Sequence, residues 1–337
     1  MKRTFVNPRQ WRAFSIYGAL CLWTLVGIGH SDWAHGAIQF SPFENLTAYQ
    51  AHYHLPKSGE FRFITVKDYQ IAQLVWEPSL NSSGTEADSI KGTVIFLHGY
   101  LDHLGLYSEL YRELLKAKYK VVAVDLPGHG LSSGKPGDVH SMADYGDLVS
   151  ALISQHGSDL ADHQSLVLMG HSTGCLAIQD YLYRNPNHPD LSAVFVAPLV
   201  RSAQWGWSTF FYRLAGGSMK EIPKWDRANS SDPEFVARLH QDPLRVGNIP
   251  GHWFSELIHW NQHQLQHAPV QTKVPLLILQ GNKDKVVAWK KNLKILKGLF
   301  PQAEIEMVPN GQHHLLNENP TIKTKVYDRL FNTLNAQ

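Results

Sequence analysis

The pentapeptide GHSTG at residues 170–174 follows the apolar run LVLM at 166–169 and leads directly into a helix-like stretch, 175–183. A strand that turns sharply into a helix around the pattern G-x-S-x-G presents the serine hydroxyl at the tip of a sheet. The flanking glycines have a steric reason, because a Cβ two residues before or after the serine would crowd the strand against the helix. Ser172 is therefore the candidate nucleophile, and the alternative is a structural serine in a tight turn.

A second match to the same pattern, GLSSG at 130–134, lies in a different context. It is preceded by PGH at 127–129 and followed by KPG at 135–137, so glycine and proline mark a loop on both sides. Only Ser172 lies between a strand pattern and a helix pattern, and Ser132 is interpreted as a loop residue.

A serine hydroxyl becomes a nucleophile when a histidine accepts its proton and a carboxylate orients that histidine. The apolar run 275–280 precedes a loop with Asp284, and the alternating run 304–308 precedes a loop with His313 and His314. We expect both loops at the sheet edge that carries the serine. The alternative for Asp284 is a solvated loop carboxylate between two lysines. Adjacent loop residues usually point in different directions, so these residues alone leave open which histidine is the base.

Backbone N–H groups that stabilise a developing oxyanion are expected at two places. One is Thr173, directly after the candidate nucleophile. The other is the loop after the apolar run 94–97, where Gly99 lets the backbone bend close to the site and Tyr100 supplies the N–H. His98 is interpreted as a side chain that anchors this loop and not as a second base.

These motifs, in this order, resemble the monoacylglycerol lipase and lysophospholipase branch of the α/β-hydrolases, a group often labelled serine aminopeptidase S33-like. HGYLDHLGLY at 98–107 is similar to the H-G-x-x-E-H-x-x-x-Y of that branch, with Asp102 in place of Glu. DLPGHGLSSG at 125–134 is similar to its D-x-x-G-H-G-x-S-x-G loop, which accounts for the second serine match. DPL at 242–244 matches a short lid signature. The resemblance covers about residues 60–330.

The histidine loop GQHHLLNE at 311–318 is similar to the bacterial G-x-x-H-E-L-L-N-E. Counted from the glycine, the resemblance places the base at His314, with Leu315 in place of the usual Glu. Thr173 replaces the more frequent Met or Gly of the branch and leaves its N–H in place. The resemblance therefore implies the catalytic set Ser172, Asp284 and His314, with Tyr100 and Thr173 as oxyanion donors.

The implied fold is an α/β-hydrolase fold, with a mostly parallel sheet, helices on both faces and an inserted helical lid. Strand and helix patterns alternate from residue 94 to residue 196, as such a sheet requires. A hairpin over 60–66 and 71–76 precedes this alternation. We predict four segments, listed here: an N-terminal segment 1–36, a first core part 37–198, the lid 199–268 and a second core part 269–337.

The implied activity is hydrolysis of carboxylic esters of single-acyl lipids through an acyl-enzyme, with no metal or organic cofactor. An aminopeptidase or amidase with the same triad is the alternative among enzymes. It needs an acidic lid residue for the ammonium group of its substrate, and the candidates are Glu221, Asp226, Glu234 and Glu256. A non-catalytic binding protein with this fold is the third reading, although no member of the triad is missing.

The predicted lid contains five of the ten tryptophans and the aromatic run 205–212. These aromatics either pack on the core or form an apolar mouth or membrane-facing patch. Three lid histidines at helical spacing, His259, His263 and His267, are read as a polar helix face, because metal ligands need several converging groups. Cys175 is read as a small core residue and not as a second nucleophile.

The N-terminal segment combines a basic start with the uncharged run 14–29 and the small residues Ala34 and Gly36, as exported proteins do. We expect export to the cell envelope, by a cleaved signal peptide or with a retained membrane anchor. The whole chain of 337 residues has 43% hydrophobic and 18% charged residues, which fits one hydrolase domain with a lid. The formal net charge of +2 gives no reason to expect a nucleic-acid partner. The sequence leaves the oligomeric state open.

Overall fold

A computed structural model describes residues 43–79, 89–157, 165–186, 188, 191–215, 217, 219–222, 229–264, 270 and 272–335. The predicted signal or anchor segment, 1–36, lies outside these residues. No helix within the described ranges is both long enough and apolar enough to cross a membrane.

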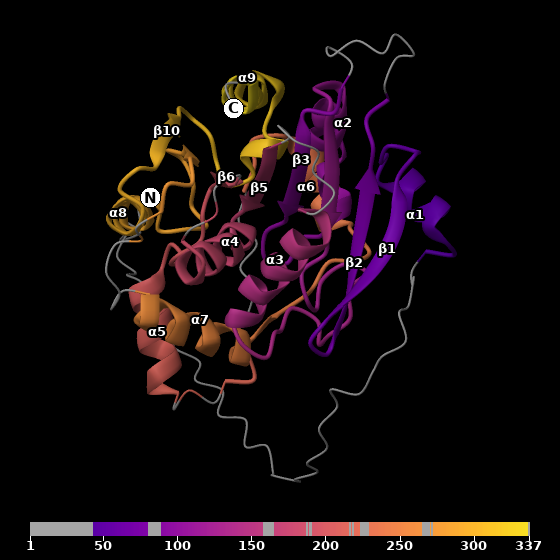
Figure 1. The fold of residues 1–337 in the computed structure, drawn as a ribbon. Coiled ribbons are helices and arrows are strands. Elements are labelled where there is room, and N and C mark those ends of the chain that lie inside the picture. The colour runs from indigo at the N-terminus through magenta and orange to yellow at the C-terminus, as the bar shows by residue number, and fades with distance from the viewer. Residues whose placement is uncertain are drawn as a thin grey trace, which may run out of the picture. The chain divides into compact units, whose positions relative to one another are not determined.

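Eight strands form one sheet in the order β1-β2-β4-β3-β5-β6-β9-β10 (Figure 1). Their bounds are β1 Glu60–Val66, β2 Tyr69–Trp76, β3 Gly92–Leu97, β4 Tyr119–Val124, β5 Ser165–His171, β6 Leu191–Val196, β9 Leu276–Gly281 and β10 Glu304–Val308. In this sheet order, every neighbouring pair from β4 to β10 is parallel. β2 pairs antiparallel with both of its neighbours, β1 and β4. The predicted mostly parallel sheet is confirmed, and so is the N-terminal hairpin.

Helices cover both faces of the sheet, because each central strand is apolar on both sides. Ile95 and Leu97 of β3 pack in one cluster of buried residues, while Val94 and Phe96 pack in the other. The first cluster includes residues of α3 (Ala143–His156), α4 (Thr173–Arg184), α7 (Gly251–Gln264) and α8 (Trp289–Leu299). The second includes residues of α1 (Leu46–His52), α2 (Ser108–Lys116) and α9 (Pro320–Asn335). Figure 1 shows α3 and α4 in front of the sheet.

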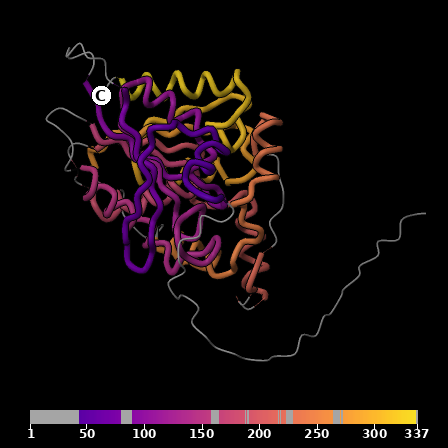
Figure 2. The backbone as a smooth tube through the Cα atoms, turned by 90° about the vertical axis from the view of Figure 1, so that its right-hand side faces the viewer, coloured from indigo at the N-terminus to yellow at the C-terminus, as the bar shows by residue number. Residues whose placement is uncertain are grey.

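The segment between β6 and β9 breaks this alternation, as predicted for the lid. It contains α5 (Trp205–Leu214), α6 (Pro233–His240) and α7. Figure 2 shows this segment, salmon to orange, along one side, with the C-terminal helix α9, yellow, at the top. The sequence pattern indicated no strand here, but β7 (Glu221–Ile222) pairs antiparallel with β8 (Ile249–Pro250). The boundaries 37–198, 199–268 and 269–337 stay predictions.

Candidate active site

Ser172 lies at the turn between β5 and α4, in a conformation that few residues other than glycine adopt. Its backbone angles are φ 50° and ψ −106°. A Cβ on Gly170 would lie 2.5 Å from the backbone nitrogen of Cys175, and one on Gly174 would lie 2.1 Å from the carbonyl oxygen of Leu97. Both flanking positions therefore require glycine, as predicted. A strained backbone at the end of a strand is typical of functional sites.

Long-range hydrogen bonds fix this turn in place. The N–H of Ser172 donates to the carbonyl oxygen of Val196 at 3.0 Å, and the Ser172 carbonyl accepts from the N–H of Leu199 at 3.1 Å. The side chain is 5% exposed. Ser132 has a different environment, because its hydroxyl donates to the carbonyl of Asp125 at 2.7 Å and accepts from the N–H of Ala72 at 2.9 Å. The second serine match therefore anchors a loop.

The structure brings His313, and not the expected His314, to the carboxylate of Asp284. His313 Nδ1 lies 2.8 Å from Asp284 Oδ2, and both side chains are buried. The prediction that His314 pairs with Asp284 is wrong. With Nδ1 engaged, the other ring nitrogen of His313, Nε2, is the one left for a serine hydroxyl.

The histidine loop matches the family pattern differently from its two ends. Counted forward from Gly311, the family pattern places its histidine at His314, but counted back from Glu318 it places the histidine at His313. Both counts cannot agree, because the loop is one residue shorter than the pattern. Glu318 is fully buried and accepts a hydrogen bond from the N–H of Gln312 at 2.5 Å. It also accepts from Ser231. These contacts hold Glu318 in place, so the histidine position is counted back from Glu318.

Asp284 is well suited to orient a histidine. Its Oδ1 accepts from the N–H groups of Val286 and Val287, at 2.8 and 3.1 Å, and Gln280 donates to its Oδ2 at 3.1 Å. Burial raises the pKa of Asp284, but the charge of His313 and these backbone hydrogen bonds lower it more, so the pKa lies below the ordinary value. The carboxylate therefore stays ionised at neutral pH, and the reading of Asp284 as a solvated residue is wrong.

His314 is also buried, but it contacts other partners than Asp284. Its Nε2 lies 3.6 Å from Asp102 Oδ1, its ring centroid lies 5.0 Å from that of Phe235, and its Nδ1 is buried without a hydrogen-bond partner. Burial lowers the pKa of His314 to about 3, so this side chain is neutral. Its N–H and that of His313 both donate to the carbonyl of Asn229, at 2.8 and 3.0 Å. The lid thereby fixes the histidine loop.

A buried network connects the loop of the nucleophile to the loop of the base. His171, next to Ser172, donates from Nε2 to the carbonyl oxygen of His313 at 3.1 Å. The hydroxyl of Tyr107 lies 2.9 Å from His171 Nδ1 and donates to Asp102 Oδ2 at 2.8 Å. Sequence reasoning gave none of these residues a role, although Asp102, His171 and Tyr107 all lie within the quoted motifs.

Three of these side chains form the group within the described ranges that could hold a metal ion. The ligand atoms of Asp102, His171 and His314 lie within 4.8 Å of one another, and all three residues are buried. However, the Tyr107 hydroxyl already donates to the carboxylate and lies within hydrogen-bond distance of His171. This hydroxyl therefore already engages two of the three candidate ligands.

The loop expected to supply the second oxyanion donor is anchored as predicted. His98 Nε2 accepts from the N–H of Leu126 at 2.9 Å, so its Nδ1 carries the proton and donates to the carbonyl of Gly99 at 2.7 Å. The ring of Tyr100 stacks on Trp253 of the lid, with centroids 3.6 Å apart. Thr173 is the first residue of α4, and the first N–H groups of a helix have no partner within it. Tyr100 and Thr173 stay the predicted donors.

The lid presents one apolar face outward. Trp207, Phe210, Phe211 and Leu214 of α5 are 54–72% exposed and lie at spacings of three and four residues. We call these four residues the α5 stripe. The opposite side of α5 is covered, since Tyr212 packs on Phe254 of α7. Part of the aromatic run therefore packs inward, and part faces away from the protein.

Two of the lid residues named from the sequence, His267 and Asp226, lie outside the described residues. His259 and His263 lie on α7, and His259 Nδ1 is 3.6 Å from Glu256 Oε1. Glu221 accepts from Asn248 at 2.7 Å. Cys175 is fully buried, and burial raises the pKa of its thiol, which fits a core residue.

The profile of a known family, described as "Serine aminopeptidase, S33", matches residues 88–320. The chain belongs to this family. The match includes both glycine motifs, the Asp284 loop and the histidine loop, and it also spans the lid.

Other proteins of similar sequence, and solved structures of similar fold, agree with this family assignment. The monoacylglycerol lipase of Mycolicibacterium smegmatis is 27% identical over 270 residues, which are 77% of this chain and 91% of that protein. A probable lysophospholipase L2 of Haemophilus influenzae is 23% identical, over 74% of this chain and 85% of its own. The crystal structure of Paleococcus ferrophilus monoacylglycerol lipase has a TM-score of 0.65 at 21% identity, covering 78% of this chain and 98% of that one. This likeness confirms the α/β-hydrolase fold.

Proposed function

We propose that this S33-family hydrolase cleaves carboxylic esters of single-acyl lipids, of the lysophospholipase or monoacylglycerol lipase type. The observation that carries the proposal is the pairing of His313 with a buried, ionised Asp284 at the sheet edge where the strained Ser172 lies. Relatives named monoacylglycerol lipase, phospholipase and probable lysophospholipase support the lipid class.

The proposed reaction begins with His313 Nε2 accepting the proton of Ser172 as its hydroxyl attacks the ester carbonyl. Asp284 keeps the ring oriented through Nδ1 and stabilises the imidazolium that forms. The N–H groups of Tyr100 and Thr173 donate to the oxyanion. His313 then protonates the leaving alcohol, and water hydrolyses the acyl-enzyme by the same steps. The residues of this reaction require no metal or organic cofactor.

We further propose that the enzyme works at a membrane surface of the cell envelope. The α5 stripe is the support, because contiguous exposed aromatics of this kind mark surfaces that contact other apolar material. Residues 1–36 carry the pattern of an exported protein, so the periplasmic side or an inner-membrane anchor is the proposed location. The membrane that the α5 stripe contacts would then also contain the lipid substrate.

The deciding experiment compares two serines that share one sequence pattern. Ser172→Ala should lose about 10⁶-fold in kcat, as in other serine hydrolases. Ser132→Ala is the matched control and should retain most activity. Substrates are p-nitrophenyl esters of increasing chain length, monoacylglycerols, lysophospholipids and aminoacyl anilides. An active Ser172→Ala together with an inactive Ser132→Ala would overturn the assignment.

The same panel separates lipid hydrolysis from the aminopeptidase alternative. Each methylene removed from water contributes about 0.8 kcal/mol, so kcat/KM should rise several-fold per added CH₂ until the pocket is filled. An anilide cleaved faster than every ester would favour the peptidase. Two of the candidate lid carboxylates in the described ranges already have neighbours, since Glu221 accepts from Asn248 and Glu256 lies beside His259. Glu234 is exposed in the first turn of α6 and is the described candidate that this alternative would use.

A further inference from the structure

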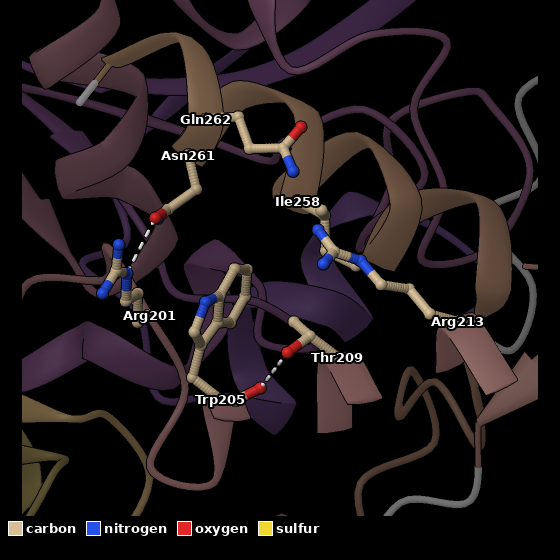
Figure 3. Close-up of a pocket in the computed structure, with 7 residues that line it drawn as sticks. All are labelled: Arg201, Trp205, Thr209, Arg213, Ile258, Asn261 and Gln262. Carbon is tan, nitrogen blue, oxygen red and sulfur yellow. Dashed lines mark hydrogen bonds between the residues drawn. The ribbon is translucent and has the colours of Figure 1, made fainter. Parts of the chain in front are cut away.

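A hollow of about 190 Å³ lies between α5 and α7 and receives two arginines (Figure 3). Arg201, from the loop after β6, and Arg213, from the last turn of α5, reach it from opposite sides. None of the described residues that line this hollow carries a carboxylate. Arg201 is half-buried and Arg213 is exposed, and both charges would attract an anion that lies between them.

Arg201 is positioned by amide groups and not by an acid. Its Nε donates to Asn261 Oδ1 at 2.8 Å, and Asn261 in turn donates to the carbonyl of Val200 at 2.6 Å. The fully buried Asn292 accepts from the backbone N–H of Arg201 at 3.1 Å and donates to its carbonyl at 3.0 Å. The guanidinium is therefore fixed in orientation while its charge is not neutralised by these contacts. No residue in the described ranges hydrogen-bonds its two terminal nitrogens, which suit a bidentate acceptor.

The remaining lining suits a tetrahedral anion with an organic substituent. Gln262 adds an amide, and the Trp205 ring supplies an apolar wall. The hydroxyl of Thr209 donates to the carbonyl of Trp205 at 2.7 Å and so is engaged within α5. A second hollow of about 390 Å³ shares Arg213, Ile258 and Gln262 with the first. There is thus space beyond the arginines for a group larger than the anion itself.

The position of Arg201 ties the hollow to the candidate active site. Leu199, two residues before it, donates its N–H to the carbonyl of Ser172, and two residues span at most about 7 Å. The carbonyl of Arg201 accepts from Ala288, and the N–H of Ala203 donates to Val286 in the Asp284 loop. The segment that carries Arg201 therefore lies against both the nucleophile loop and the acid loop.

We propose that Arg201 and Arg213 bind the phosphate of a lysophospholipid whose ester carbonyl lies at Ser172. This assignment rests on the proposed function and narrows it, because a monoacylglycerol has no group for these arginines. In this binding mode the glycerol backbone of the lipid would have to connect the ester at Ser172 to a phosphate between the two arginines. The headgroup beyond the phosphate would lie in the second hollow.

The test uses the full chain and two substrates that differ in the phosphate, 1-palmitoyl-lysophosphatidylglycerol and 1-palmitoylglycerol, in neutral detergent micelles. The readout is the ratio of their kcat/KM values. Arg201→Gln and Arg213→Gln should each lower this ratio about tenfold to a hundredfold, since each removes a charge-assisted hydrogen bond. Arg201→Lys should restore part of the loss. Arg238→Gln, an exposed lid arginine outside the hollow, is the matched control and should leave the ratio unchanged.

A ratio within twofold of wild type in both arginine variants would overturn the headgroup site. Calorimetry of inorganic phosphate with the Ser172→Ala variant is the second arm. Phosphate binding that Arg201→Gln abolishes, without any change in the lipid ratio, would identify a free-phosphate site and refute the lipid assignment. Hydrolysis of neither lipid nor p-nitrophenyl butyrate would instead overturn the proposed function. Fluorophosphonate labelling and thermal unfolding identify any variant that has failed to fold.

Discussion

Replacing each of the two adjacent histidines, His313 and His314, by alanine is the sharpest test of this site. His313→Ala removes the group that contacts Asp284, while Gln280 and the N–H groups of Val286 and Val287 still satisfy that carboxylate. The protein should therefore remain folded. Loss of a triad base should lower kcat by about 10⁴ to 10⁶.

His314→Ala should have the opposite profile. Its Nδ1 has no hydrogen-bond partner and its Nε2 lies 3.6 Å from Asp102, so truncation chiefly removes buried packing against Phe235. The cost is about 2–4 kcal/mol, as for other large-to-small changes in a core. At about 2–4 °C per kcal/mol the Tm should fall by several degrees. Below the transition, kcat should stay within about tenfold of wild type.

Both variants are measured with p-nitrophenyl butyrate, a fluorophosphonate probe and thermal unfolding. The probe should label wild type and His314→Ala at Ser172, and label His313→Ala poorly. Strong labelling of His313→Ala, with a dead but stable His314→Ala, would refute the reasoning and restore the order counted from Gly311.

Three further results are expected. Gly174→Ala should fold poorly or lose activity, because its Cβ would lie 2.1 Å from the carbonyl oxygen of Leu97, and soluble yield with normal turnover would contradict this. Asp284 has a lowered pKa in the folded state, so its stabilising effect is complete above its unfolded pKa of about 4 and is lost as the pH falls through the folded value. Asp284→Asn should therefore reduce the fall in Tm on acidification, and an unchanged Tm profile would argue against the ionised carboxylate. Trp207→Ser together with Phe211→Ser should weaken binding to phospholipid vesicles several-fold without changing p-nitrophenyl butyrate hydrolysis, and unchanged vesicle binding would remove the α5 stripe from the membrane proposal.

The sequence alone determined the sheet and the elbow. Strand patterns predicted β10 over 304–308 with the bounds that the structure has, because alternating apolar residues fit a half-buried strand. The glycines around Ser172 were predictable for a local reason, since the clash of a Cβ at 170 or 174 arises within the strand–turn–helix unit and the strand beside it. Local sterics of this kind are encoded in a few consecutive residues.

Only the tertiary structure decided which histidine meets Asp284. The direction of a side chain in a loop depends on what fixes the backbone, and here the partners are Asn229 of the lid and Glu318 beyond the loop. The contact between Arg201 and Asn261 likewise joins residues 60 positions apart. Motif spacing records order along the chain, whereas these contacts are set by packing between distant segments. The reaction type was therefore readable from the sequence, but the identity of the base and the charged hollow were not.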